Sequence, residues 1–189
     1  MKKVTIFFTI TILCITLFST SCSQKRNINI KNNAVMGSLA APTEIIVFSD
    51  FQCPFCKKTA RTLRRMVKAH PNRFKIYFKH FPLKYHQWSF RAACASEAAR
   101  LQGKFWKMHD LLFERNDELD EDTFLNLARE LNLDENQFIK DINSQIVQQK
   151  VEADKKEGER LKISGTPYFF VNRQPFHGSY VDLKIQFTP

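Results

Sequence analysis

The hydrophobic and polar positions of this chain follow two periodicities. Glu44–Phe48 (EIIVF) is a nearly unbroken apolar run, which predicts a strand buried on both faces. Residues 74–81 (FKIYFKHF) alternate apolar side chains with lysines and predict a second strand, which Pro82 ends. Between these strands, apolar residues recur with helical spacing from Ala60 to about His70, which predicts an amphipathic helix.

The pattern then becomes helical over a long segment, about 87–161, and predicts four or five consecutive helices. Strands return at Tyr168–Val171 and, after a turn at Asn172 and Arg173, in the stretch QPFHG; a last short helix begins near Val181. This order of elements predicts an α/β domain with a helical insertion between the second strand and the strand that follows Thr-Pro.

The first residues follow a different pattern. Lys2 and Lys3 precede the uncharged run Val4–Phe18, and small residues follow it up to Ser21. A charged start, an apolar run and a small-residue cleavage zone predict a signal peptide at residues 1–21, and therefore export. The run is shorter than the ~20 residues of a membrane span, which favours cleavage over an uncleaved anchor.

Cys22 directly follows the small residues and resembles the lipid-modified cysteine of bacterial lipoproteins, although Ser19 stands where those motifs usually carry leucine. We therefore predict lipid attachment at Cys22, with ordinary cleavage nearby as the alternative. Residues 22–43, which include the stretch QKRNINIKNN, are expected to be a polar tether that holds the folded domain, residues 44–189, away from the membrane.

Composition supports one folded domain. The chain has 189 residues, 43% of them apolar and 25% charged, so disordered and fibrous classes are excluded. The formal charge of +10 comes from cations spread along the chain and interleaved with acids. This distribution favours a solvated basic surface over a nucleic-acid partner.

Two of the five cysteines lie at or before Cys22, which leaves Cys53, Cys56 and Cys94 for the folded domain. A disulfide between Cys53 and Cys56 would close a very short loop and would stabilise the fold little, so the pair is expected to serve chemistry. Cys94 lies among alanines and is either a small packed residue or a regulatory thiol.

The stretch SDFQCPFCKKTA places Cys53 where the first strand turns into the helix. Pro54 suits the first helical position, and free backbone N–H groups and the positive end of the helix dipole should lower the pKa of Cys53. Cys56 lies one turn further, on the buried side, and should stay protonated. The pattern predicts an exposed, ionised Cys53 that forms mixed disulfides and a Cys56 that resolves them.

Two other interpretations of the pair are a zinc half-site and two inert buried thiols. Zinc needs two further ligands at suitable spacing, but the five histidines are scattered and the chain has no second Cys-x-x-Cys pair. We therefore favour redox chemistry and expect no metal and no cofactor beyond the two sulfurs. Pro167, which follows Gly165 and Thr166, is either a cis proline in a tight turn or a trans proline that opens the strand.

Four stretches carry a family resemblance: FSDFQCPFC, KHFPL, QGKFWKMHDLLF and GTPYFFVN. Together they resemble the DsbA-like thioredoxin-fold thiol-disulfide oxidoreductases from about Glu44 to Leu183. The resemblance implies a thioredoxin-like fold, with Cys53 as the nucleophile, Cys56 as the resolving thiol and Pro167 as a cis proline beside them. It also implies that the backbone of Thr166 pairs with an extended substrate strand.

The residues between the cysteines, Pro54 and Phe55, form the loop that tunes the redox potential. Oxidising members of the family often carry histidine where this chain has Phe55, and some thioredoxin-fold relatives bury a carboxylate in the preceding strand, which is apolar here. Asp50 or Lys79 is a candidate to replace that carboxylate. The loss of a histidine interaction is expected to make the pair more reducing.

These observations predict an exported, periplasmic, lipid-anchored enzyme that introduces disulfides into reduced or unfolded exported proteins and exchanges electrons with a membrane redox partner. One alternative is a periplasmic reductase or isomerase with the same fold. An alternative from another class is a binding module or holdase for unfolded exported chains, in which the dithiol has no role. The redox partner and the specific clients leave no signature in the sequence.

Overall fold

The computed structural model describes residues 25–187. The predicted signal peptide, residues 1–21, and the predicted lipid site at Cys22 lie outside the described residues. Within the described part, no helix is both long enough and apolar enough to cross a membrane.

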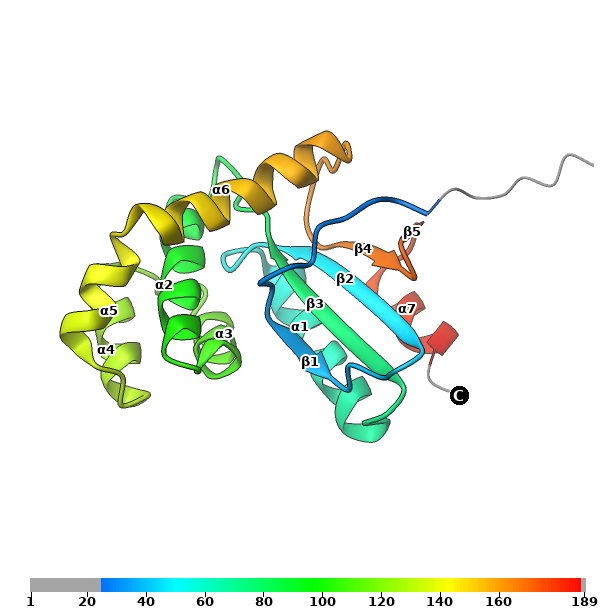
Figure 1. Cartoon of the computed structure of the whole chain (residues 1–189), viewed down its shortest axis with the longest axis horizontal. Helices are drawn as coiled ribbons and strands as arrows, with labels where there is room; N and C mark the ends of the chain where they lie inside the picture. The colour runs from blue at the N-terminus through cyan, green and yellow to red at the C-terminus, as the bar shows by residue number, and fades with distance from the viewer. Residues whose placement is uncertain (1–24, 188–189) are drawn as a thin grey trace, which may run out of the picture.

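A single five-stranded sheet forms the centre of the domain, in the order β1-β3-β2-β4-β5 (Figure 1). Strands β2 and β3 are parallel, and all other neighbours are antiparallel. The strands are β1 (Val35–Gly37), β2 (Thr43–Ser49), β3 (Phe74–His80), β4 (Tyr168–Val171) and β5 (Gln174–Phe176).

The helices form two groups. Helices α1 and α7 pack against each other behind the sheet in the view of Figure 1, and α2 to α6 form a block inserted between β3 and β4. Their bounds are α1 (Pro54–Ala69), α2 (Ser89–Leu101), α3 (Phe105–Glu114), α4 (Glu121–Glu130), α5 (Glu135–Ile142), α6 (Gln145–Arg160) and α7 (Tyr180–Phe187). The predicted mixed α/β fold with its helical insertion is confirmed.

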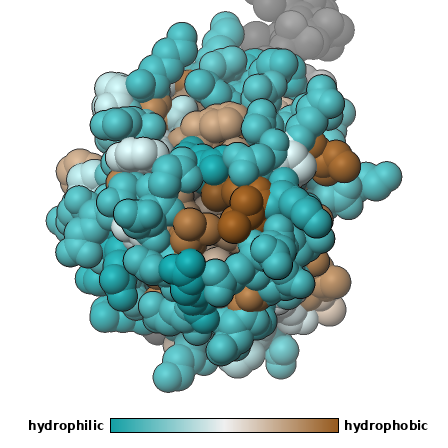
Figure 2. Space-filling model, turned by 90° about the vertical axis from the view of Figure 1, so that its left-hand side faces the viewer, coloured by the Kyte–Doolittle hydropathy of each residue, from teal (hydrophilic) through white to brown (hydrophobic). Residues whose placement is uncertain are grey.

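Polar residues start three helices of the inserted block. The side chains of Asp120, Asp134 and Ser144 are the N-caps of α4, α5 and α6, and each accepts a hydrogen bond from a backbone N–H three residues later. Such caps satisfy backbone donors that have no partner within the helix, and each stabilises the helix by about 1 kcal/mol. The exposed end of the block is mostly hydrophilic, with hydrophobic side chains near the centre of this face and a few at its edges (Figure 2).

Strand β2 contributes to a hydrophobic core on each face of the sheet, as the predicted doubly buried strand requires. Ile45 and Val47 belong to the main core, which extends beneath α1 and into the helical block. Ile46 and Phe48 point to the other face, where they belong to a smaller core with Phe81 and Phe170. The strand that precedes the cysteines is therefore held rigidly from both sides.

The expectation of a polar tether before β2 is wrong for residues 25–43, the part of the tether that the structure describes. Ile28 is only 2% exposed and belongs to the smaller core, and β1 pairs with β3 at the edge of the sheet. Isolated apolar residues in a polar context give a weak signal in sequence, but the uncovered sheet face and edge provide partners for them. The folded domain therefore begins well before Thr43.

A buried ion network connects β3 to α6 and α2. Lys79 Nζ lies 2.8 Å from Asp154 Oδ1 and 2.5 Å from Glu157 Oε2, and these lysine and aspartate side chains are each 3% exposed. Beside them, His80 Nε2 lies 3.0 Å from Glu97 Oε1. We use the name ion network for these five residues, which attach the helical block to the sheet.

Candidate active site

Cys53 is the N-cap of α1 and directly follows the turn after β2. Its backbone is extended, with φ −77° and ψ 120°, and Pro54 takes the first helical position. The Cys53 N–H donates to the Asp50 carbonyl at 3.2 Å, and the Cys53 carbonyl accepts the first helical hydrogen bond from Lys57 at 3.2 Å. The rigid strand and the helix start together place the Cys53 sulfur at the positive end of α1.

Several hydrogen bonds lower the pKa of Cys53 from the usual 9.0 to about 6. The largest contribution is the hydrogen bond from the Cys56 thiol, and burial of Cys53 partly opposes it. The Thr166 side chain and the backbone N–H groups of Cys56 and Phe55 also favour the thiolate. Only the last two are free N–H groups of a helix start, as the sequence predicts, whereas the Cys56 thiol and the Thr166 hydroxyl are side-chain donors.

Cys56 has the opposite character. It is fully buried, and burial together with the neighbouring Cys53 raises its pKa well above the usual value. Both thiols are free in this structure. At neutral pH the pair therefore consists of a thiolate at Cys53 and a thiol at Cys56, which is the division of roles expected of a nucleophile and a resolving thiol.

The expectation that Cys53 is exposed is wrong, because the residue is only 4% exposed. Its sulfur lies 3.4 Å from the carbonyl oxygen of Thr166, so the loop before β4 covers it. These residues are 113 positions apart, which is why local sequence patterns did not reveal the cover.

The loop at Thr166 and Pro167 lies beside the sulfur and does not hydrogen-bond to the backbone of any other described segment at Thr166. The Thr166–Pro167 peptide bond is cis. Among the described residues, no nitrogen or oxygen hydrogen-bonds to the Thr166 hydroxyl, and Thr166 makes no backbone-to-backbone hydrogen bond. Its backbone N–H is therefore available to pair with another extended chain, and within the described part of the chain its carbonyl oxygen contacts only the Cys53 sulfur.

Two exposed aromatic residues lie near the dithiol, one in the first turn of α1 and one in the loop after β3. Phe55 is 59% exposed, and Tyr85 is 77% exposed. Tyr85 lies in the loop that Asp50 holds, since the Asp50 carboxylate accepts from the Leu83 N–H at 2.8 Å and contacts His86 Nδ1 at 2.8 Å. Exposed aromatic side chains beside a reactive sulfur provide apolar contacts for an unfolded chain.

Asp50 and Lys79, the two candidates to replace the buried carboxylate of some thioredoxin-fold relatives, bind groups other than the two cysteines. The Asp50 carboxylate binds the Gln52 N–H, Leu83 and His86, and Lys79 binds Asp154 and Glu157. The polar contacts of both side chains are thus satisfied away from the sulfurs. This part of the sequence-based hypothesis is not supported.

Ser49 is a polar neighbour of the dithiol that sequence reasoning missed. Its side chain hydrogen-bonds to Cys56 and favours the Cys56 thiolate, although burial has the larger effect on that pKa. Ser49 also lines a narrow internal gap with Thr59 and His109, and burial lowers the pKa of this histidine, so it is neutral. The signal in the sequence that could have identified Ser49 is its position, as a hydroxyl residue at the end of an apolar strand shortly before the cysteine motif.

The remaining chemical groups are separate from this site. Cys94 is buried in α2, and burial raises its pKa to about 12, so it is protonated at neutral pH. In the part of the chain that the structure describes, no three His, Cys, Asp or Glu side chains are grouped so that they could hold a metal ion.

The fold and the dithiol together define a thioredoxin-like thiol-disulfide oxidoreductase: a CPFC pair at a helix start, beside a cis proline that precedes a strand. The family model described as "DSBA-like thioredoxin domain" matches residues 44–180. The chain belongs to this DsbA-like family.

Similar proteins agree with this assignment. A thioredoxin-like oxidoreductase from Silicibacter pomeroyi has 27% identity and a TM-score of 0.70, and the match covers 82% of this chain and 90% of that one. Oxidised BdbD from Bacillus subtilis has 22% identity and a TM-score of 0.74, over 86% of this chain and 95% of that one, and shows the same fold.

Among curated proteins, the Na(+)/H(+) antiporter NhaA 3 of Salinispora tropica is 34% identical over 147 residues, which is 77% of this chain. The match covers 22% of that relative, so the chain spans about a fifth of its length.

Proposed function

We propose that this protein is an exported thiol-disulfide oxidoreductase that transfers its Cys53–Cys56 disulfide to reduced exported proteins. A client thiolate attacks the Cys53 sulfur, the bond between Cys53 and Cys56 breaks, and Cys56 leaves as a thiolate that takes up a proton. A second client thiolate then attacks the client sulfur of the mixed disulfide. The client is oxidised by two electrons, and Cys53 leaves as a thiolate.

The pKa of about 6 at Cys53 carries this proposal. A thiol with a low pKa is a good leaving group, so the second step releases the client readily. The hydrogen bonds that stabilise the Cys53 thiolate exist only after the disulfide is reduced. They therefore favour the reduced form and make the disulfide an oxidant.

Clients are held by their backbone and by apolar contacts. The free backbone N–H of Thr166 supports the addition of one extended client strand beside Cys53. Phe55 and Tyr85 add exposed aromatic surface next to that strand. This recognition depends little on client sequence, which suits an enzyme that acts on many unfolded chains.

The proposed location follows from the first residues. Export by the signal peptide at residues 1–21 takes the domain to an oxidising compartment, and lipid attachment at Cys22 holds it at the membrane. Because Ile28 packs on the domain, the free tether is shorter than the sequence suggests and the domain lies close to the bilayer. A membrane redox partner reoxidises the dithiol there.

The equilibrium potential of the dithiol in the full chain, measured against glutathione, tests the direction of electron flow. A value near or above about −150 mV supports the oxidase, a value near −180 mV indicates an isomerase, and a value at or below about −230 mV indicates a reductase. Binding of a reduced, unfolded client that is unchanged after replacement of both Cys53 and Cys56 would instead indicate a holdase.

A further inference from the structure

The outward side of α1 carries only positive charge. The helix has 16 residues and no acidic side chain. Its six basic residues are Lys57, Lys58, Arg61, Arg64, Arg65 and Lys68.

Two of these cations face α3 and have partners there. Lys57 Nζ lies 3.1 Å from the Glu114 carbonyl and 2.8 Å from Asn116 Oδ1, and Arg64 forms an ion pair with Asp110. The other four are exposed and make no ion pair with any described acid. We call these four the basic stripe: Lys58, Arg61, Arg65 and Lys68.

The spacing of the basic stripe follows one side of the helix, because its members are three or four residues apart. Like charges at this spacing destabilise a helix, and of the four cations only Lys68, in the last turn, interacts favourably with the helix dipole. The helix holds no acidic side chain that would offset the repulsion between them. The stability of α1 therefore does not explain the basic stripe.

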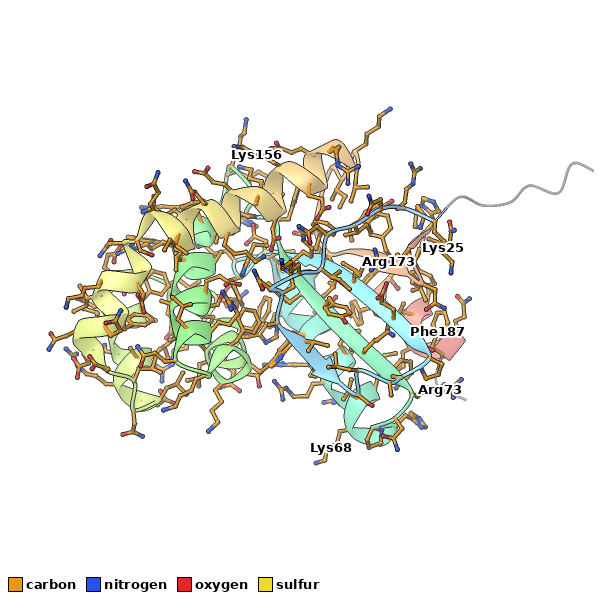
Figure 3. The ribbon with its side chains drawn as sticks, in the orientation of Figure 1. Lys25, Lys68, Arg73, Lys156, Arg173 and Phe187 are labelled. Carbon is orange, nitrogen blue, oxygen red and sulfur yellow. The ribbon has the colours of Figure 1, made fainter. Side chains whose placement is uncertain are left out.

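The basic stripe begins five residues after the reactive cysteine, in the second turn of α1. Lys58 Nζ lies 5.7 Å from the centre of the Phe55 ring, two residues after Cys53. The other end is Lys68, which projects away from the domain near the end of α1 (Figure 3). Ten residues of helix span about 15 Å, the length of roughly five residues of extended chain.

We infer that the basic stripe binds an acidic segment next to the reactive cysteine of a client protein. This inference rests on the proposed function, since it names the class of client. A chain bound at Cys53 passes Phe55 and reaches Lys58, where Glu or Asp side chains meet unpaired cations. Charge complementarity of this kind raises the association rate and decreases with salt.

A client chain fits the basic stripe better than an anionic membrane does. The stripe is one residue wide and starts at Lys58, next to Phe55, which is 59% exposed. A bilayer in contact with it would cover Phe55 and block the approach to Cys53, whereas an extended chain delivers its own cysteine there. The membrane is therefore treated as an alternative outcome of the test.

The test measures the rate at which the disulfide form of the full chain, in a non-ionic detergent, oxidises three peptides. Each peptide holds one cysteine followed by five Glu, five Gln or five Lys residues. The variant R61Q/R65Q removes two stripe charges. The matched control K140Q/K156Q removes two exposed charges elsewhere, and Lys156 projects from the side of the molecule opposite Lys68 (Figure 3).

We expect the Glu peptide to react at least about tenfold faster than the Lys peptide at low salt, and this ratio to fall as salt is added. R61Q/R65Q should remove most of the ratio, while K140Q/K156Q should keep it and both variants should oxidise the Gln peptide at the unmodified rate. Equal rates for all three peptides overturn the inference but leave the proposed function intact. No oxidation of any peptide overturns the proposed function itself.

Binding to lipid vesicles tests the alternative that the basic stripe binds an anionic membrane instead of an acidic client segment. If R61Q/R65Q leaves the peptide rates unchanged but removes a preference of the protein for phosphatidylglycerol over phosphatidylcholine vesicles, the basic stripe faces a membrane and the inference is wrong.

Discussion

The dithiol site and the ion network are both buried and polar, but they differ in how fully their groups are paired. In the ion network, Lys79 has two carboxylate partners and a backbone carbonyl, and Asp154 has two lysine partners. At the dithiol, no nitrogen or oxygen of the described residues hydrogen-bonds to the Thr166 hydroxyl. This hydroxyl lies beside the sulfurs, the atoms that must change partners, whereas the paired groups of the ion network hold the helical block in place.

The electrostatic consequences differ as well. In the ion network, burial raises the pKa of Asp154, but Lys150 and Lys79 outweigh it and keep the pKa below its usual 3.8. This carboxylate keeps its charge throughout the neutral range. At the dithiol, the pKa of Cys53 falls to about 6, so its charge changes near neutral pH. The ion network therefore stays charged at neutral pH, whereas the Cys53 thiol gains and loses its proton near neutral pH.

The largest predicted effect is a loss of activity without a loss of stability, at the dithiol. Cys53→Ser should abolish oxidation of client thiols, because no nucleophile or disulfide remains, while the melting temperature of the reduced protein changes little. Cys94→Ala is the matched control and should retain full activity, since Cys94 is buried and protonated. Full activity of Cys53→Ser in a peptide oxidation assay would contradict the mechanism.

Cys56→Ser should stop turnover at the mixed disulfide. Cys53 remains a thiolate and can attack the disulfide of an oxidised client, which forms a mixed disulfide and releases one client thiol, but no Cys56 thiol is left to displace the client from Cys53. Non-reducing electrophoresis of the expressed variant should show covalent client adducts that disappear on addition of dithiothreitol. Equal adduct formation by Cys53→Ser would show that the roles of the two cysteines are assigned wrongly.

Asp154→Ala tests the ion network and should have the opposite effect to Cys53→Ser: the protein loses stability but keeps its oxidation activity. Removing one partner leaves Lys79 buried with its charge less compensated, which typically destabilises a protein by about 3–5 kcal/mol. Guanidinium unfolding measures this loss, and Asp117→Ala, at an exposed position, is the control. The oxidation rate per folded molecule should stay the same; a large loss of that rate would mean that the two regions are coupled.

The two regions should respond to pH in separate windows. The thiolate of Cys53 stabilises the reduced fold above the usual pKa of 9.0, and this contribution is lost as pH falls through about 6. The contribution of Asp154 is present above pH 3.8 and is lost only as pH falls through its lowered pKa.

Guanidinium unfolding of the reduced and oxidised proteins tests these windows. The stability of the reduced form relative to the oxidised form should decrease between about pH 9 and 6, and both forms should lose stability together below about pH 4. A constant difference between the two forms across pH 9 to 6 would mean that the Cys53 thiolate is not stabilised.

The smallest predicted effect concerns tuning within the dithiol. Phe55→His adds a donor between the cysteines, which should stabilise the Cys53 thiolate further and shift the potential by tens of millivolts towards oxidising. Phe55→Ala removes the ring without adding a donor and is the control. Equilibration with glutathione measures both, and equal potentials would show that position 55 does not act through hydrogen bonding.

The sequence predicted the parts of the site whose causes are local. An apolar strand, a turn and Cys-Pro-Phe-Cys at the start of an amphipathic helix are enough to place Cys53 at the N-cap and Cys56 on the buried side. The order of strands and helices was also predictable, because each element has its own periodicity.

The sequence did not predict the packing of residues near Ile28, the pairing of the ion network or the cover over Cys53. Each depends on partners far along the chain: Lys79 and Glu157 are 78 positions apart, and Cys53 and Thr166 are 113 apart. No periodicity links such positions.

The sequence by itself determined the chemical character of this protein: a dithiol at a helix start, in which the pKa of Cys53 is lowered and Cys56 stays protonated. Only the tertiary structure decided how that dithiol is presented. The loop of Thr166 and Pro167 covers Cys53, and the segment around Ile28 and β1 completes the sheet. The physical reason is that hydrogen bonds and helix dipoles act within a few residues, whereas burial depends on which distant surfaces meet.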